Sequence, residues 1–109
     1  MGRTLKPKLV RDRIPEIIES AGEVAITRIA EEGEYVTYLL DKIVEEAVEL
    51  RGATEVDHQI EEVADLREVL AAFIAAVSFS EDEITAVQRS KVDTRGAFQD
   101  RVILIVTSS

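Results

Sequence analysis

The chain has 109 residues, contains no cysteine and carries a formal net charge of −9. Its length suits one small domain with a modest core, and the absence of cysteine excludes disulfides and thiolate metal sites. The longest apolar run, residues 69–77, is too short to cross a bilayer, which needs about 20 residues. No apolar run follows the basic start as it would in a signal peptide. We therefore predict a single domain over residues 1–109 that is soluble and cytoplasmic.

The charge is unevenly distributed along the chain. Residues 31–68 contain 13 acidic side chains against three basic ones, whereas residues 3–13 contain five basic side chains against one acid. An acidic middle argues against binding of duplex nucleic acid, because a duplex needs a basic face for its phosphates. Basic ends around an acidic centre instead suit a small polyanion that is held through both metal ions and cationic side chains.

The N-terminal part is predicted to be an arm, a short helix and a strand. Residues 8–19 indicate an extended arm that runs into a helix, with Pro15 in the first turn, where its missing N–H costs nothing. Residues 21–22 end that helix. Residues 24–29 alternate in polarity and are rich in β-branched side chains, which predicts a strand. The tail, residues 98–106, predicts a second strand, and we expect the two to pair antiparallel.

Two longer helices are predicted in the middle of the chain, over about residues 35–51 and 54–77, packed antiparallel as a hairpin. The core stripe expected on the first comprises Val36, Leu39, Leu40, Ile43, Ala47 and Leu50. The core stripe expected on the second comprises Val56, Ile60, Val63, Leu66, Leu70, Ile74 and Val77. Beyond Val69 this helix is apolar on nearly every side, so we expect it to be enclosed. A capping box from Ser80 to Glu83 predicts a further helix over 81–94, and the fold class is mainly α.

Carboxylates recur three residues apart on both helices of the hairpin, and residues at that spacing lie on one side of a helix. Glu46 and Glu49 form one pair, and Glu62 and Asp65 form the other. If the two faces meet, four carboxylates converge and repel each other unless a proton or a cation intervenes. Hard divalent cations prefer oxygen ligands, which favours Mg²⁺ as the resident ion. Glu45 points away from the core stripe and is expected to be solvated.

Several features have two interpretations. His58 lies one turn from Glu62 and has the chemistry of a base or a ligand, but a polar residue at a helix start is more usual, so we leave it out of the site. Lys91 and Arg95 are one turn apart and fit either a surface pair or a phosphate clamp. A non-catalytic helical interaction domain, or a nucleotide sensor that turns over slowly, would also carry such an acid pattern.

The acid pattern Glu45-Glu46-x-x-Glu49 followed by Glu62-x-x-Asp65 resembles the motif of the all-α nucleoside triphosphate pyrophosphohydrolases, the MazG-like superfamily. This superfamily also includes the dimeric dUTPases and phosphoribosyl-ATP pyrophosphohydrolase.

One branch, described as predicted house-cleaning NTP pyrophosphatases, is more similar still. Its members open with a stretch like residues 8–18, have a strand like residues 27–29 and close on a stretch like Arg95-Gly96-x-Phe98. This chain has Ala97 where that branch usually has a second glycine. Phosphoribosyl-ATP pyrophosphohydrolase is a weaker match because it lacks the block at 8–18, and a function like that enzyme's is the alternative within the superfamily.

The resemblance implies a helical bundle with a small two-stranded β element that hydrolyses a nucleoside triphosphate to nucleoside monophosphate and pyrophosphate, in house-cleaning of the nucleotide pool. It implies that Mg²⁺, or Mn²⁺, is held by Glu46, Glu49, Glu62 and Asp65, with Glu45 as an accessory acid. It further implies that Lys8, Arg11, Lys91 and Arg95 bind the substrate phosphates. Glu45 and Glu49 are the candidates to accept the proton of the attacking water. The resemblance and the apolar third helix together predict a homo-oligomer, a dimer or tetramer, without a membrane partner.

Overall fold

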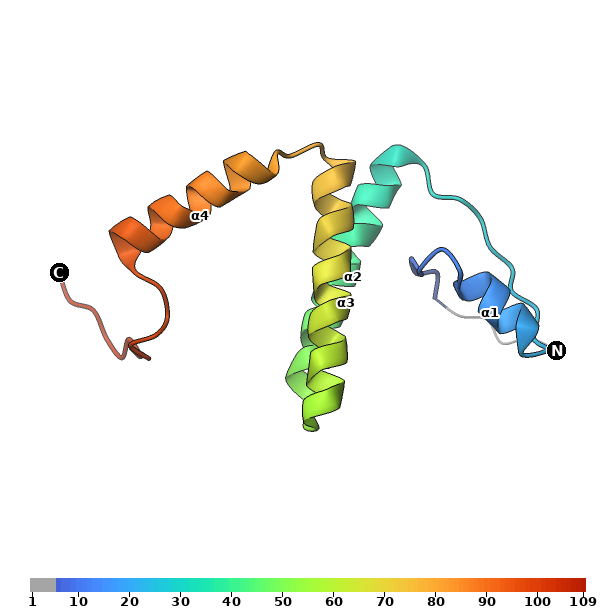
Figure 1. Ribbon diagram of the computed structural model, residues 1–109, viewed down its shortest axis with the longest axis horizontal. Helices are drawn as coiled ribbons and strands as arrows, with labels where there is room; N and C mark the ends of the chain where they lie inside the picture. Colours follow the sequence, from blue (N-terminus) through green and yellow to red (C-terminus); the bar gives the residue numbers. More distant parts are fainter. Residues whose placement is uncertain (1–5) are drawn as a thin grey trace. The chain divides into compact units, whose positions relative to one another are not determined.

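Four α-helices are found in residues 6–109, the part of the chain that a computed structural model describes (Figure 1). They are α1 (Ile14–Ser20), α2 (Glu32–Gly52), α3 (Val56–Ala76) and α4 (Glu81–Arg95). By its contacts the chain divides into two compact units, Met1–Val77 and Ser78–Ser109. The prediction of a mainly α fold is confirmed. Among these helices none combines the length and the apolarity that crossing a membrane requires.

Local chemistry explains where the first two helices begin and end. Pro15 lies in the first turn of α1, and Gly22 follows the helix with a φ of 91°, a left-handed conformation that suits glycine. Helix α2 begins three residues earlier than predicted. The backbone N–H of Glu31 donates to the side chain of Glu34 at 3.2 Å, so an otherwise unpaired donor at the helix start is satisfied.

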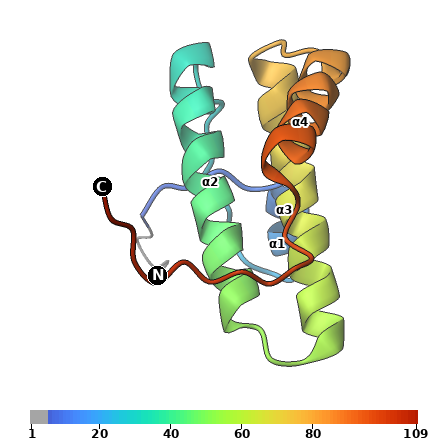
Figure 2. The same ribbon diagram turned by 90° about the vertical axis from the view of Figure 1, so that its left-hand side faces the viewer.

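The packed centre of the first unit is the antiparallel hairpin of α2 and α3, in which α3 lies in front of α2 in Figure 1 and beside it in Figure 2. Leu39 on α2 is 1% exposed and Val69 on α3 is 8% exposed, and both therefore belong to its core. In the connecting turn Ala53 is buried, and the side-chain amide of Gln59 donates to its carbonyl oxygen at 3.1 Å. The predicted hairpin is confirmed, although its buried core is small.

The core stripe predicted for α3 is wrong. Val56, Ile60 and Val63 are 67%, 61% and 45% exposed, whereas Glu62 and Val69 are the residues of α3 that are buried. The side of α3 that carries Glu62 and Val69 therefore faces α2. A helix that is apolar on more than one side does not reveal in its spacing which side a partner covers.

The C-terminal part of α3 was expected to be enclosed, but within one chain it is partly exposed. Leu70 is 41% exposed, and Ala71, Ala75 and Ala76 are exposed as well. The hairpin partner covers only one side of the helix, because two packed helices touch along a single line of side chains. The remaining apolar side faces outward in this structure.

The predicted β element is also wrong: no strand forms in residues 6–109. The two segments, 24–29 and 98–106, have no regular structure, and their apolar side chains are exposed, with Ile26 at 95% and Ile105 at 86%. Alternating β-branched residues favour a strand because their side chains fit the surface of a pleated sheet. A strand exists only where a neighbour satisfies its N–H and C=O groups, and the pattern does not supply that neighbour.

In the second unit, α4 begins where its cap was predicted. The hydroxyl oxygen of Ser80 accepts a hydrogen bond from the backbone N–H of Glu83 at 3.3 Å. The helix ends at Arg95, and Gly96 follows with a φ of 82°. The serine cap and the terminal glycine were both readable in the sequence, because each acts on backbone groups within one helical turn.

Candidate metal centre

The acids of the site come from facing sides of the hairpin. Helix α2 carries Glu45, Glu46 and Glu49, and α3 carries Glu62 and Asp65. Glu46 and Glu62 are only 6% and 7% exposed, which is unusual for glutamates. They take positions that apolar residues would occupy in an ordinary helix pair.

Carboxylate oxygens from the two helices lie close enough to share a ligand. One oxygen each from Glu46, Glu62 and Asp65 lie within 4.8 Å of one another, and the same holds for Glu45, Glu46 and Glu49. Glu46 belongs to both groups and links them. Three of the four acids expected to converge, Glu46, Glu62 and Asp65, therefore lie together, whereas Glu49 is grouped with Glu45 and Glu46 on α2. Three oxygens at such separations fit the ligand shell of one divalent cation, although acidic groups of this kind are also common in proteins without an ion.

Two oxygens of this cluster are buried without a hydrogen-bond partner, Oε2 of Glu46 and Oε2 of Glu62. A buried carboxylate without a partner destabilises the fold unless a proton or a cation compensates its charge. The pKa of Glu46 is raised to about 7, chiefly by burial and then by the neighbouring carboxylates of Glu62 and Glu49. The positive charge of Lys42 acts in the opposite direction and lowers this pKa. The metal-free site therefore retains a proton on Glu46 at a pH at which an ordinary glutamate has lost it.

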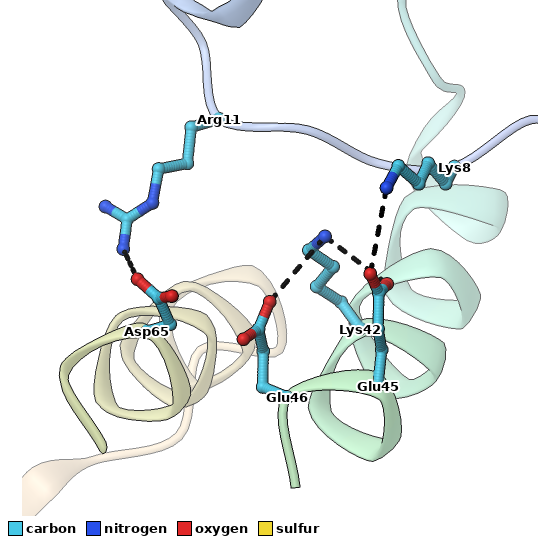
Figure 3. A network of polar contacts seen from close by, with 6 residues as sticks. All are labelled: Lys8, Arg11, Lys42, Glu45, Glu46 and Asp65. Carbon is cyan, nitrogen blue, oxygen red and sulfur yellow. Dashed lines mark hydrogen bonds and ion pairs between the residues drawn. The ribbon is translucent and has the colours of Figure 1, made fainter. Parts of the chain in front are cut away.

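Two lysines, Lys8 and Lys42, contact acids of the second group (Figure 3). The Nζ atom of Lys42 lies 3.3 Å from Oε2 of Glu45 and 3.7 Å from Oε1 of Glu46. The Nζ atom of Lys8 lies 3.8 Å from Oε1 of Glu45. Glu45 is thus paired with two lysines, and the expectation that it is a plain solvated acid is wrong. Of the two acids Glu45 and Glu49, Glu49 is the more exposed.

The N-terminal arm, which carries Lys8, also brings Arg11 to the site. A guanidinium nitrogen of Arg11, Nη2, donates to Oδ1 of Asp65 at 2.8 Å, and the arm that carries both Arg11 and Lys8 passes beside the acids (Figure 3). Two of the four predicted phosphate-binding residues therefore lie at the carboxylates.

The other two predicted phosphate-binding residues, Lys91 and Arg95, lie on α4 in the unit that begins at Ser78. Both are exposed and stand four residues apart, on the same side of the helix. Their role toward a substrate stays a prediction.

Two residues that sequence reasoning left out of the site contact its buried acids. The Nε2 atom of His58 lies 3.0 Å from Oε1 of Glu62, and Lys42 contacts Glu46 as described above. The interpretation of His58 as a polar helix-start residue without a role at the site is therefore incomplete. Each basic residue precedes its acid by four positions, and this spacing was the signal in the sequence.

Comparison with known proteins assigns no family to this chain. No family model matches it, and no solved structure matches it. A protein of Mycolicibacterium smegmatis described as uncharacterized is 43% identical over 54 residues, which is 50% of this chain and 55% of that protein. The chain thus spans about half the length of this relative, whose description names no activity.

Proposed function

We propose that this protein is a Mg²⁺-dependent nucleoside triphosphate pyrophosphohydrolase of the MazG-like kind, with Mn²⁺ as a second competent ion. The observation that carries the proposal is the pair of buried oxygens without partners, Oε2 of Glu46 and Oε2 of Glu62, within a cluster that also includes Asp65. Burial of these two oxygens destabilises the metal-free protein, and a bound cation would compensate their charge. The donor set contains only carboxylate oxygens, which suits a hard ion such as Mg²⁺.

Four acids would hold the ion: Glu46 and Glu49 from α2, Glu62 and Asp65 from α3. When bound, Mg²⁺ would supply positive charge to the phosphate oxygens and acidify a coordinated water molecule. Attack at the α-phosphorus would release a nucleoside monophosphate and pyrophosphate. The proton of the attacking water would pass to Glu45 or Glu49, the two acids of α2 that are not buried.

The cationic residues would neutralise the phosphates that the ion does not reach. Arg11 and Lys8 already lie at the acids, and each would exchange its carboxylate partner for a phosphate oxygen when substrate binds. An arginine fork matches two phosphate oxygens at once, which favours Arg11 for the more specific contact. For Lys91 and Arg95 on α4, a phosphate-binding role rests on the family resemblance alone.

We further propose that the assembled protein is a homo-oligomer, a dimer or a tetramer. The support is the apolar surface that the hairpin leaves uncovered: Leu40, Val44 and Val48 on α2 are 46%, 63% and 54% exposed. The outward stripe of α3 adds Val56, Ile60 and Val63. Exposed apolar side chains in this number on the site-bearing hairpin are typical of an interface. A second copy offers the same surface, so a two-fold dimer would cover both at once.

The test of the activity is product analysis with a panel of nucleoside triphosphates at varied Mg²⁺, with and without added inorganic pyrophosphatase. We expect monophosphate and pyrophosphate in equal amounts. Glu46→Gln, Glu62→Gln and Asp65→Asn should each lower turnover more than about tenfold, because the amide keeps the shape but loses the charge that holds the ion. Glu45→Gln should do less. Glu61→Gln, an exposed neighbour of Glu62, is the matched control and should stay active.

Each other outcome points to a different function. Tight nucleotide binding without turnover would identify a sensor, and the absence of both binding and turnover would identify a non-catalytic helical domain. Release of inorganic phosphate from the triphosphate without added pyrophosphatase would contradict attack at the α-phosphorus. If Asp65→Asn turns over substrate as fast as the unaltered protein, the assignment of the site is wrong.

A further inference from the structure

The two oxygens of the buried Glu62 carboxylate are in different environments. Oε1 lies 3.0 Å from Nε2 of His58, one helical turn earlier on α3, whereas Oε2 is buried and has no partner. One oxygen is therefore held and the other is left available. An ionised carboxylate only accepts hydrogen bonds, so in the contact with ionised Glu62 the donor is Nε2 of His58.

The same arrangement occurs on the facing helix. Oε1 of Glu46 lies 3.7 Å from Nζ of Lys42, again four residues earlier, and Oε2 of Glu46 is buried without a partner. The two oxygens without partners belong to acids of one three-residue group, which Asp65 completes. Each helix thus contributes to this group one buried acid that has one held and one available oxygen.

A helix-stabilising pair does not explain this arrangement. Exposed pairs at this spacing stabilise a helix only slightly, and here the acid is buried, so its removal from water opposes folding. A glutamate also has three rotatable side-chain bonds, and a contact at one oxygen restricts all three. What the contact with His58 provides is therefore the direction of the free oxygen.

We infer that His58 is a positioning residue: it holds Oε1 of Glu62 so that Oε2 is aimed at the cation, a role that rests on the metal site proposed above. Partners that orient a ligand from behind typically contribute about 10- to 100-fold to metal affinity. The ion is the class of ligand addressed, and His58 itself stays outside its shell.

The experiment is a titration of the metal-free full chain with Mn²⁺ alone, followed by the paramagnetic resonance signal of the unbound ion. His58→Ala should weaken Mn²⁺ binding by about 10- to 100-fold. His58→Gln, whose amide N–H can donate to Glu62, should recover most of the affinity. Asp57→Ala, an exposed neighbour in the same turn, is the control and should bind as the unaltered chain does. Circular dichroism and the thermal midpoint without metal would register loss of helix or stability in any variant.

Rescue by glutamine separates positioning from a structural role. If His58→Ala lowers the thermal midpoint but binds Mn²⁺ as tightly as the unaltered chain, while Glu62→Gln does not, the inference about His58 is wrong and the metal site stands. Equal losses in His58→Gln and His58→Ala, with both variants fully helical, would also overturn it. If the unaltered chain binds no Mn²⁺, both the metal site and the positioning role fail.

Discussion

Glu46 is the residue at which burial and charge conflict most directly. Its pKa is raised from the ordinary 4.5 to about 7, chiefly by burial. Between these two values the folded metal-free protein keeps a proton that the unfolded chain has lost. The contribution of Glu46 to stability should therefore be highest below the lower pKa, fall as the pH rises toward 7, and lose no more above it.

Glu46→Gln tests this dependence, because the amide carries no proton to lose. With chelator present, thermal midpoints between about pH 5.5 and about pH 8 should fall more steeply for the unaltered chain than for the variant. The variant should also be the more stable of the two at the upper end. Identical slopes would mean that Glu46 titrates alike in the folded and unfolded states. Glu61→Gln serves as control, since its carboxylate is exposed.

Arg11 forms an ion pair with Asp65, one of the acids proposed to bind the ion. Its contact with Asp65 at 2.8 Å joins side chains that are 57% and 38% exposed, so the pair contributes little to stability. Arg11→Ala should raise the Mn²⁺ affinity of the nucleotide-free protein by about two- to fivefold, because a competing cation is removed. The same variant should bind nucleotide more weakly.

The matched control for this variant is Arg13→Ala, since Arg13 pairs with Glu16 on α1 and not with an acid of the cluster. A Mn²⁺ titration without nucleotide and a nucleotide titration with Mg²⁺ measure the two effects separately. Weaker Mn²⁺ binding by Arg11→Ala would show that the arm supports the ion and does not compete with it.

Among the elements, the α2–α3 hairpin holds all five acids, and its packing rests on few residues. Leu39 is 1% exposed and is the largest side chain that is fully buried in residues 6–109. Leu39→Ala should lower the free energy of unfolding by about 2–5 kcal/mol, because it removes buried apolar surface and leaves a cavity. Urea unfolding followed by circular dichroism measures this. Leu104→Ala, at a residue that is 75% exposed, should change it little, and equal effects of both variants would mean that Leu39 is not the core of the hairpin.

The elements were predictable to different degrees. Helix α4 lies at 81–95 against a predicted 81–94, since Ser80 and Gly96 act on backbone groups close to them. The expected strands 24–29 and 98–106 do not form, since a strand depends on a partner that local sequence does not supply. Helical residues carry most of their hydrogen bonding within one turn, which makes a helix the more local and more predictable element.

For the whole molecule, the proposed oligomer makes the uncovered stripe of the hairpin the decisive surface. We expect light scattering at micromolar concentration to give a mass of at least two chains. Ile60→Asp should reduce it to one chain without loss of helix, because a carboxylate would be buried without a partner at the interface. Ile26→Asp is the control, since Ile26 is 95% exposed and lies outside the hairpin. A one-chain mass for the unaltered protein, with and without Mg²⁺ and nucleotide, would contradict the proposal.

Periodic spacing and capping residues were enough to predict the helices and to place Glu46, Glu62 and Asp65 on faces that meet. These features are local, because a helix repeats its geometry every few residues. That α3 buries Glu62 and leaves Ile60 outside, that Arg11 pairs with Asp65, and that His58 holds Glu62 became visible only in the folded chain. The direction in which an apolar stripe faces, and the partner that a charge finds, depend on segments that come together in space, and no spacing within one helix specifies them.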